Sequence, residues 1–252
     1  MTKTKPPAYF AIISDIHSNL DALDAVLADI DQWPCRGILC LGDIVGYGPE
    51  PAACVQRVMD RCAVSVLGNH EAMLFLSDQF PPEDFGASVG EPIALAAKQV
   101  SADQMAWLRG LPISADLDPI ILSHTSLREP PNFHYIDNME EVEAHFGLQT
   151  TFVSFHGHTH VPVVWKEKGG NITFFKPNGE TLQLDEDSRY AINVGSVGQP
   201  RDNDPRASYA LYDYEKRHLV HRRVDYDIAR AQDRFKTANL PARNASRLEK
   251  GQ

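Results

Sequence analysis

The chain has 252 residues and a formal net charge of −10, with 43% hydrophobic and 23% charged residues. These values are typical of a folded globular protein with a sizeable core, and they argue against intrinsic disorder. No apolar run approaches the roughly 18 residues of a membrane span, and the negative charge would repel duplex nucleic acid unless bound cations reverse the local field.

Strand and helix patterns alternate in the first half of the chain. The apolar run at residues 9–14 predicts a buried strand, and apolar residues at helical spacing behind Asn19 predict a helix over 19–30. The same reasoning predicts a strand at 37–41, a helix at 51–61 and a strand at 63–67. This order predicts a parallel sheet covered by helices, with ligands at the carboxyl ends of its strands.

The second half changes from helices to strands. Residues 91–108 predict two helices broken near Ser101, followed by a strand at 119–123 and a helix at 139–146. Further strands are predicted at 151–155, 161–166, 171–176, 180–184, 190–194, 207–212 and 218–223, and a last helix at 228–238. We therefore expect two sheets face to face with helices outside, in a single domain over residues 1–240. The polar C-terminal tail, residues 241–252, is expected to be frayed.

The cysteines and the N-terminal apolar run indicate a cytoplasmic protein. The apolar run is too short for the hydrophobic region of a signal peptide, and Asp15 follows it closely. No two of the four cysteines have C-x-x-C spacing. We therefore expect reduced and partly buried thiols at Cys35, Cys40, Cys54 and Cys62.

The stretch Phe155-His156-Gly157-His158-Thr159-His160 contains three histidines, each two residues from the next. In an extended segment, all three side chains would leave on the same face, which would suit a metal ion. An accidental cluster in a solvated loop is the alternative, and the run by itself leaves both interpretations open.

Polar side chains also follow the other predicted core strands. The motifs, in chain order, are Asp15-Ile16-His17, Gly42-Asp43, Gly68-Asn69-His70, His124 and Gly157-His158-Thr159-His160. Each alone is common in turns, but five at the carboxyl ends of successive strands indicate a shared site. Oxygen and nitrogen donors without a thiolate suit a pair of borderline divalent ions better than a closed structural zinc.

This ordered set, D-x-H…G-D…G-N-H-[ED]…H…G-H-x-H, resembles the motifs of the calcineurin-like metallophosphoesterases. The match runs from Asp15 to His160, and residues 193–201 resemble a Gly-Ser-Val segment of small bacterial and archaeal members. The resemblance implies an α/β fold, the four-layer α-β-β-α sandwich of two mixed sheets flanked by helices. That fold agrees with the two-sheet pattern predicted above.

The resemblance also implies two divalent transition-metal ions, chosen among Mn, Fe, Zn, Ni and Co with manganese favoured. One ion would be held by Asp15, His17, Asp43 and His160. The other would be held by Asp43, Asn69, His124 and His158. Asp43 would bridge, because the two oxygens of a carboxylate can face two cations. His156 is left over, and we expect it to pack behind the ligands rather than bind a metal.

The mechanism implied by this arrangement is attack of hydroxide on phosphorus. Two divalent ions lower the pKa of a shared water and neutralise the charge of the phosphoryl group. His70 is expected to stabilise the transition state or protonate the leaving oxygen, with a structural hydrogen bond to a carboxylate as the alternative. Arg201, together with Asn69 and His70, is expected to contact substrate, unless Arg201 pairs with Asp202 or Asp204 at the surface.

One departure from the family narrows the expected substrate. Protein serine/threonine phosphatases and symmetrical dinucleoside tetraphosphatases of this superfamily carry an Arg after Gly-Asp and another beside Gly-Asn-His-Glu. Here Ile44-Val45 and Ala72-Met73 stand at these places. We therefore expect hydrolysis of phosphodiesters, and also monoesters, of small molecules. The aromatic and Pro-rich loop 128–135 is expected either to wall the site and stack a base or aryl group, or only to pack down.

Two alternatives remain open. The first is a phosphomonoesterase acting on nucleotides or phosphoproteins. The second is a non-catalytic scaffold with the same fold, which we would expect to have lost ligands, whereas this chain keeps all seven and His70. We expect no stable binding of duplex nucleic acid and no membrane association, and the sequence does not determine the oligomeric state.

Overall fold

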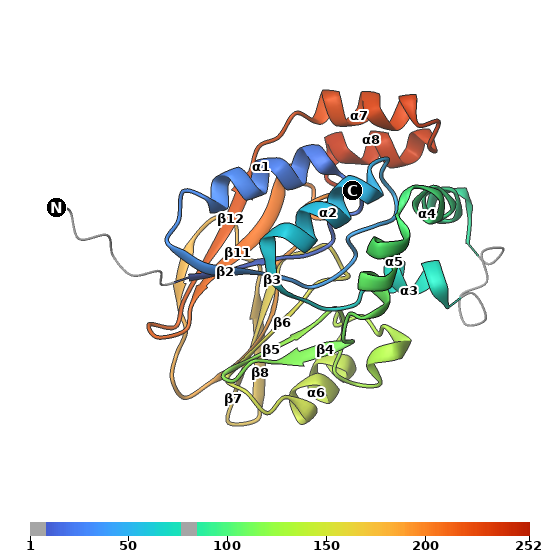
Figure 1. The fold of residues 1–252 in the computed structure, drawn as a ribbon. Coiled ribbons are helices and arrows are strands. Elements are labelled where there is room, and N and C mark those ends of the chain that lie inside the picture. Colours follow the sequence, from blue (N-terminus) through green and yellow to red (C-terminus); the bar gives the residue numbers. More distant parts are fainter. Residues whose placement is uncertain (1–8, 77–84) are drawn as a thin grey trace.

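The computed structural model of the chain describes residues 9–76 and 85–252. Two six-stranded sheets lie face to face, and helices cover their outer faces (Figure 1). Both sheets are mixed, which confirms the predicted four-layer sandwich. Residues 1–8 and 77–84 of the predicted 1–240 domain lie outside the described residues.

The first sheet combines three parallel N-terminal strands with three late strands. The N-terminal strands are β1 (Tyr9–Ile13), β2 (Cys35–Cys40) and β3 (Cys62–Ser65). The late strands are β11 (Ala207–Asp213), β12 (His218–Val224) and β9 (Thr181–Gln183). Strand β11 pairs antiparallel with β1, so the order is β3-β2-β1-β11-β12-β9. Strands β1 and β2 therefore place their carboxyl ends side by side near the centre of the sheet.

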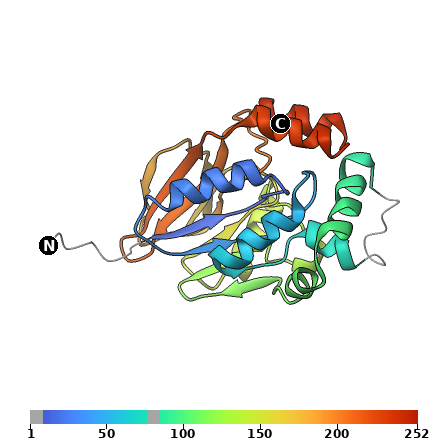
Figure 2. The same cartoon turned by 45° about the horizontal axis from the view of Figure 1, so that its top comes forward.

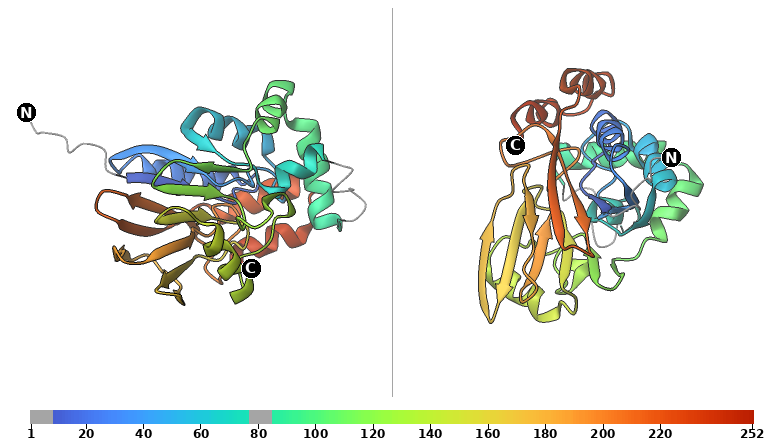
Figure 3. Two further views of the ribbon diagram at one scale, coloured as in Figure 1. Left: turned by 90° about the horizontal axis from the view of Figure 1, so that it is seen from below. Right: turned by 90° about the vertical axis from the view of Figure 1, so that its left-hand side faces the viewer.

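The second sheet has three parallel strands at its centre, namely β5 (Ile120–Ser123), β6 (Val153–His156) and β10 (Arg189–Asn193). Antiparallel strands flank them on both sides: β4 (Ser114–Asp116), β7 (Val163–Lys168) and β8 (Asn171–Phe175). The order is β4-β5-β6-β10-β7-β8. Figure 3 shows from the side that the N-terminal helices lie away from the strands of this sheet.

The helices fall into three groups. Those that pack on the first sheet and on one another are α1 (Leu20–Ile30), α2 (Pro51–Arg61), α3 (Asn69–Phe75), α4 (Ala87–Gln99) and α5 (Ala102–Arg109). Helix α6 (Met139–Leu148) covers the second sheet. Helices α7 (Ile228–Thr237) and α8 (Ala242–Lys250) pack against each other, and α7 contacts the first turn of α1 (Figure 2). No helix in the described ranges is long and apolar enough to cross a membrane.

Local sequence signals explain several helix boundaries. The Asn19 side chain accepts a hydrogen bond from the backbone N of Ala22 at 3.2 Å, as an N-cap does. Ser101 and Gln104 form a capping box at the start of α5, which separates it from α4. These two boundaries were predicted from the sequence, and the structure confirms them.

One core lies between the two sheets. Its members are buried on strands of both sheets, and the largest include Phe155, Tyr190 and Tyr212. Another core joins the first sheet to its helices, and a smaller one joins the second sheet to α6. The central strands are thus covered on both faces, which explains why their sequences are continuous apolar runs.

The prediction of a frayed C-terminal tail is wrong. Residues Ala242–Lys250 form α8, which buries Ala245 and Leu248 against α7. The buried Asn244 side chain donates to the backbone oxygens of Tyr47 and Ser88, at 3.2 and 2.9 Å. The sequence of this segment is mostly polar because only one face of the short helix is buried. Helix α3 and strand β4 were not predicted; the start of α3, Gly68-Asn69-His70, is a pattern common in turns, and β4 has only three residues.

Candidate metal centre

The loops that follow β1 and β2 bind each other through their backbones. The amides of Asp15, His17 and Ser18 donate to the carbonyls of Gly42, Asp43 and Ile44, at 3.1, 2.9 and 2.9 Å. Asp15, His17 and Asp43 have φ values of 53°, 49° and 52°, a conformation that non-glycine residues rarely adopt. Such strain is tolerated where the surroundings hold it, and it concentrates at functional sites.

Two glycines of the sequence motifs allow further loops to approach. A Cβ on Gly68 would lie 2.2 Å from Oδ1 of Asp43, and a Cβ on Gly157 would lie 2.4 Å from Oδ2 of Asp15. Neither position has room for a side chain, so both glycines are required sterically. Loops from both sheets thereby converge at the carboxyl ends of β1, β2, β3, β5 and β6.

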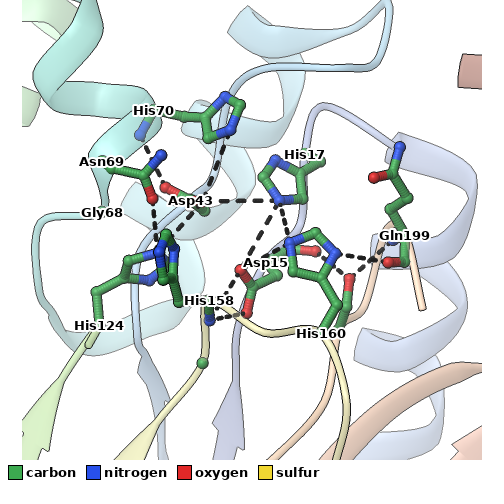
Figure 4. A network of polar contacts seen from close by, with 12 residues as sticks. Asp15, His17, Asp43, Gly68, Asn69, His70, His124, His158, His160 and Gln199 are labelled. Atoms are coloured by element: carbon green, nitrogen blue, oxygen red, sulfur yellow. Dashed lines mark hydrogen bonds and ion pairs between the residues drawn. The ribbon is translucent and has the colours of Figure 1, made fainter. Parts of the chain in front are cut away.

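Among the described residues, two groups of buried side chains lie close enough to hold metal ions (Figure 4). In each group the potential ligand atoms lie within 4.8 Å of one another. The first group is Asp15, His17, Asp43 and His160, and the second is Asp43, His124 and His158. Asn69 adjoins the second group, with Oδ1 3.1 Å from Nε2 of His124. Asp43 belongs to both groups.

Backbone carbonyls determine the tautomers of three imidazoles. Nδ1 of His17, His124 and His160 lies 3.1, 2.8 and 2.6 Å from the carbonyl oxygens of Val45, Leu41 and Gln199 respectively. Because a carbonyl only accepts, each Nδ1 carries a proton, and each Nε2 is directed into the site, where it can bind a cation when it is deprotonated. Nε2 of His17 and Nε2 of His160 are 3.0 Å apart. Two facing lone pairs at this distance repel unless a cation lies between them.

The electrostatics of the site also call for positive charge. Burial opposes ionisation of Asp43, yet His124 and His70 hold the pKa of Asp43 well below its usual range. Burial likewise opposes protonation of His124, but Asp43, 3.3 Å away, raises the pKa of His124 to about 9. Burial lowers the pKa of His158 to about 3, so that its imidazole stays neutral and can act as a ligand. The donor set and its charge therefore fit a pair of divalent cations.

Comparison with known proteins supports this assignment. The family described as the calcineurin-like phosphoesterase superfamily domain matches residues 9–217. The chain belongs to the calcineurin-like phosphoesterase superfamily. An uncharacterized protein of Methanocaldococcus jannaschii is 36% identical over 245 residues, which cover 94% of this chain and 96% of that protein.

Two solved structures show the same fold along nearly the whole chain. The crystal structure of a metallophosphoesterase from Sphaerobacter thermophilus has a TM-score of 0.86 and 38% identity, covering 97% of this chain and 100% of that one. A hypothetical protein from Pyrococcus horikoshii OT3 has a TM-score of 0.76 and 19% identity, covering 97% and 98%. At that identity, the second similarity concerns the fold alone.

The three-histidine stretch behaves differently from the simple expectation for an extended segment. Strand β6 ends at His156, and His158 and His160 have φ values of 69° and 59°, so the chain leaves the strand before either histidine. The segment is therefore not extended over all three histidines, and the condition under which they would share one face is not met. His158 and His160 belong to different groups, while His156 is buried outside both, with its ring 5.8 Å from that of His145.

His70 lies at the edge of both groups. Its backbone N donates to Oδ1 of Asp43 at 2.9 Å, but its side-chain Nε2 is 4.0 Å from Oδ2 of Asp43, too far for a hydrogen bond. The ring packs between His17 and Tyr47, with both centroid distances 4.7 Å, and burial lowers the pKa of His70 to about 4. The geometry thus gives no support to a structural hydrogen bond from this imidazole to a carboxylate.

Arg201 is held beside the site rather than at a surface ion pair. Its Nη2 donates to Oε1 of Gln199 at 3.0 Å, and its guanidinium lies 5.5 Å from the centroid of the Tyr47 ring. The two acids considered as its partners bind other arginines: Asp202 pairs with Arg223 and Asp204 with Arg206. The guanidinium is therefore positioned next to the groups around Asp43.

The role of Glu71 in the site was not anticipated from the sequence. Its buried carboxylate accepts hydrogen bonds from the backbone N of Asp43, Ile44, Val45 and Gly68, at 2.8, 2.8, 2.9 and 3.1 Å. Burial and the charge of Asp43 raise the pKa of Glu71 to about 7, against the effect of these N–H donors. The acidic position of the G-N-H-[ED] pattern was the only signal in the sequence. Glu71 thus holds the backbone that presents Asp43.

Replacing Glu71 with Gln tests this role. In the side-chain amide of Gln, only the oxygen accepts hydrogen bonds, whereas the NH2 group donates. The amide therefore cannot accept hydrogen bonds from all four N–H groups, and we expect the free energy of unfolding to fall by about 1–3 kcal/mol. Urea unfolding in the presence of a chelator measures the loss without a contribution from bound metal. Glu91→Gln, at an exposed position of α4, is the matched control and should change stability little. Equal stabilities of the two variants would contradict the role.

Proposed function

We propose that this protein is a dinuclear-metal-dependent phosphoesterase that hydrolyses phosphodiester bonds of small molecules, and also monoesters. The single observation that carries the proposal is the sharing of the buried Asp43 carboxylate between two groups of histidine nitrogen and carboxylate oxygen donors. The two ions are chosen among Mn, Fe, Zn, Ni and Co, and two manganese ions are favoured. The proposed ligands are Asp15, His17, Asp43, Asn69, His124, His158 and His160.

When bound, the two ions would supply a water molecule of lowered pKa and neutralise charge on the phosphoryl oxygens. The residues of the chain direct this chemistry. The carbonyls behind His17, His124 and His160 hold their Nε2 atoms toward the site. Nε2 of His70 faces the site, 4.0 Å from Oδ2 of Asp43, and we infer that this atom gives a proton to the leaving oxygen. Asn69 and Arg201 contact the phosphoryl group.

The cationic groups around the site favour diesters over monoesters. Ile44, Val45 and Ala72, at the places of the family's phosphate-binding arginines, are buried and apolar. Arg201 supplies a guanidinium beside the Tyr47 ring. A diester carries one negative charge, whereas a monoester carries up to two near neutral pH and gains more from additional arginines. This supports a phosphodiesterase, with a phosphomonoesterase on nucleotides or phosphoproteins as the second candidate.

Metal content and a pair of aryl esters test the proposal directly. After reconstitution with Mn²⁺, elemental analysis should find two ions per chain, and bis(p-nitrophenyl) phosphate should be hydrolysed with higher kcat/KM than p-nitrophenyl phosphate. A preference for the monoester would favour the second candidate. Absence of both metal and turnover would instead make the protein a scaffold with this fold.

Asp43→Asn tests the shared carboxylate. The change removes one negative charge between both groups, so we expect metal content to fall below two and turnover to be lost. Asp60→Asn, at an exposed position of α2, should leave both unchanged. A variant with two bound ions and the wild-type rate would exclude a bridging role for Asp43.

His70→Ala separates catalysis from metal binding. We expect metal content to stay near two while kcat falls by ~10²–10⁴-fold, the usual contribution of a proton-transfer group. His218→Ala, on the remote strand β12, serves as the control. If the His70 variant loses metal instead, the imidazole acts in holding the site rather than in proton transfer.

A further inference from the structure

A cavity of about 580 Å³ lies beside the candidate metal centre, on the outer face of the second sheet. Its walls come from the segment before α6, from the loop after β6 and from β7 and β8. The side chains that matter here are Tyr135, Met139, Thr159, Val161, Trp165 and Phe174. We call this cavity the aromatic groove.

The aromatic groove adjoins the proposed metal ligands. Thr159, which lines the groove, stands in the sequence between His158 and His160. Tyr135 stacks on the imidazole of His158, with ring centroids 4.0 Å apart and planes at 27°. A group bound in the groove would therefore lie next to a phosphoryl group held at the metal centre.

The walls of the groove contain large apolar side chains that are exposed to solvent. Phe174 is 58% exposed, and Tyr135 and Met139 are each 46% exposed. Phe174 on β8 lies opposite Trp165 on β7, with ring centroids 4.9 Å apart. Exposed rings around a hollow gain free energy when a flat apolar group covers them.

Two polar features also point to a bound ligand. Trp165 is only 6% exposed, yet its Nε1 has no hydrogen-bond partner among the described residues. Buried indole N–H groups are normally satisfied, so an acceptor on a ligand would complete this one. Lys176 lines both the groove and a neighbouring cavity of about 690 Å³ that also contains Arg201. Its ammonium can attract an anionic ligand to the junction of the two cavities.

We propose that the aromatic groove binds a planar aromatic substituent of the phosphoester, an aryl group or a nucleobase. The proposal rests on the phosphoesterase function proposed above, because that function supplies the phosphoryl group at the metal centre. Trp165 and Phe174 provide the ring surfaces, Tyr135 lies between the groove and the metal centre, and the Trp165 N–H offers one donor to a ring acceptor or ester oxygen. The groove thus selects among substrates by what is attached to phosphorus.

Binding of two phosphonates tests the groove without any turnover. Isothermal titration of the Mn²⁺-reconstituted protein should give a dissociation constant about tenfold lower for phenylphosphonate than for methylphosphonate, as expected for one stacked ring with its buried area. Phe174→Ala should abolish this preference. Phe175→Ala is the matched control, since Phe175 lies on the same strand but opposite Val164 of the core between the sheets.

A hydrolysis assay with a constant leaving group tests the same preference in turnover. The kcat/KM for p-nitrophenyl phenyl phosphate, and for the p-nitrophenyl ester of thymidine 5′-phosphate, should exceed that for p-nitrophenyl methyl phosphate. In the Phe174→Ala variant, the kcat/KM for the aromatic esters should no longer exceed that for the methyl ester, which should still be hydrolysed. A higher kcat/KM for the phenyl ester would indicate that the groove prefers an aryl group, and a higher kcat/KM for the thymidine ester would indicate a nucleobase.

The outcomes separate the two proposals. Equal affinity for the two phosphonates, no binding of either, or an equal effect of both phenylalanine changes would overturn the groove assignment. Tighter binding of octylphosphonate than of phenylphosphonate, lost on Phe174→Ala, would also overturn it in favour of an alkyl chain. Hydrolysis of none of the esters, with the phenylphosphonate preference intact, would overturn the phosphoesterase function and leave the groove as a binding site.

Discussion

The structure of the site depends on holding the Asp43 carboxylate, buried and ionised, at a point where two sheets meet. Glu71 accepts hydrogen bonds from three backbone N–H groups of the Asp43 loop and from that of Gly68, and further hydrogen bonds join the Asp43 loop to the loop after β1. The loops adopt strained backbone conformations, and Gly68 leaves no room for a larger residue. Such a site costs folding free energy, which the cores on both faces of each sheet must offset.

Charge explains how an acidic protein can act on anions. The net charge of −10 would repel a phosphoester at long range. The buried acids are nevertheless arranged around imidazoles with inward lone pairs, so the local demand is for cations. Once cations are bound, the field at the site reverses, and Arg201 and Lys176 extend the positive region toward the neighbouring cavity. Local arrangement rather than net charge decides which ligand is attracted.

The candidate metal centre and the aromatic groove lie on different elements of the fold. The candidate ligand residues come from the loops at strand ends, whereas the aromatic groove is built on β7, β8 and the segment before α6. Helix α8, beyond the part of the chain matched by the family, supports the Tyr47 loop through Asn244. Changes in the groove could therefore alter substrate choice while the metal centre stays the same.

Much of the fold and most of the site follow from local sequence. Apolar runs, helix caps and motif order predicted the strands, the main helices and the set of side chains that converge, because these signals act over a few residues. The tertiary structure alone decided that the chain leaves the strand after His156, that Glu71 binds the Asp43 loop, and that residues 242–250 form a helix. The aromatic groove likewise exists only where distant segments meet. These features depend on contacts between residues far apart in the chain, and local pattern contains no record of such contacts.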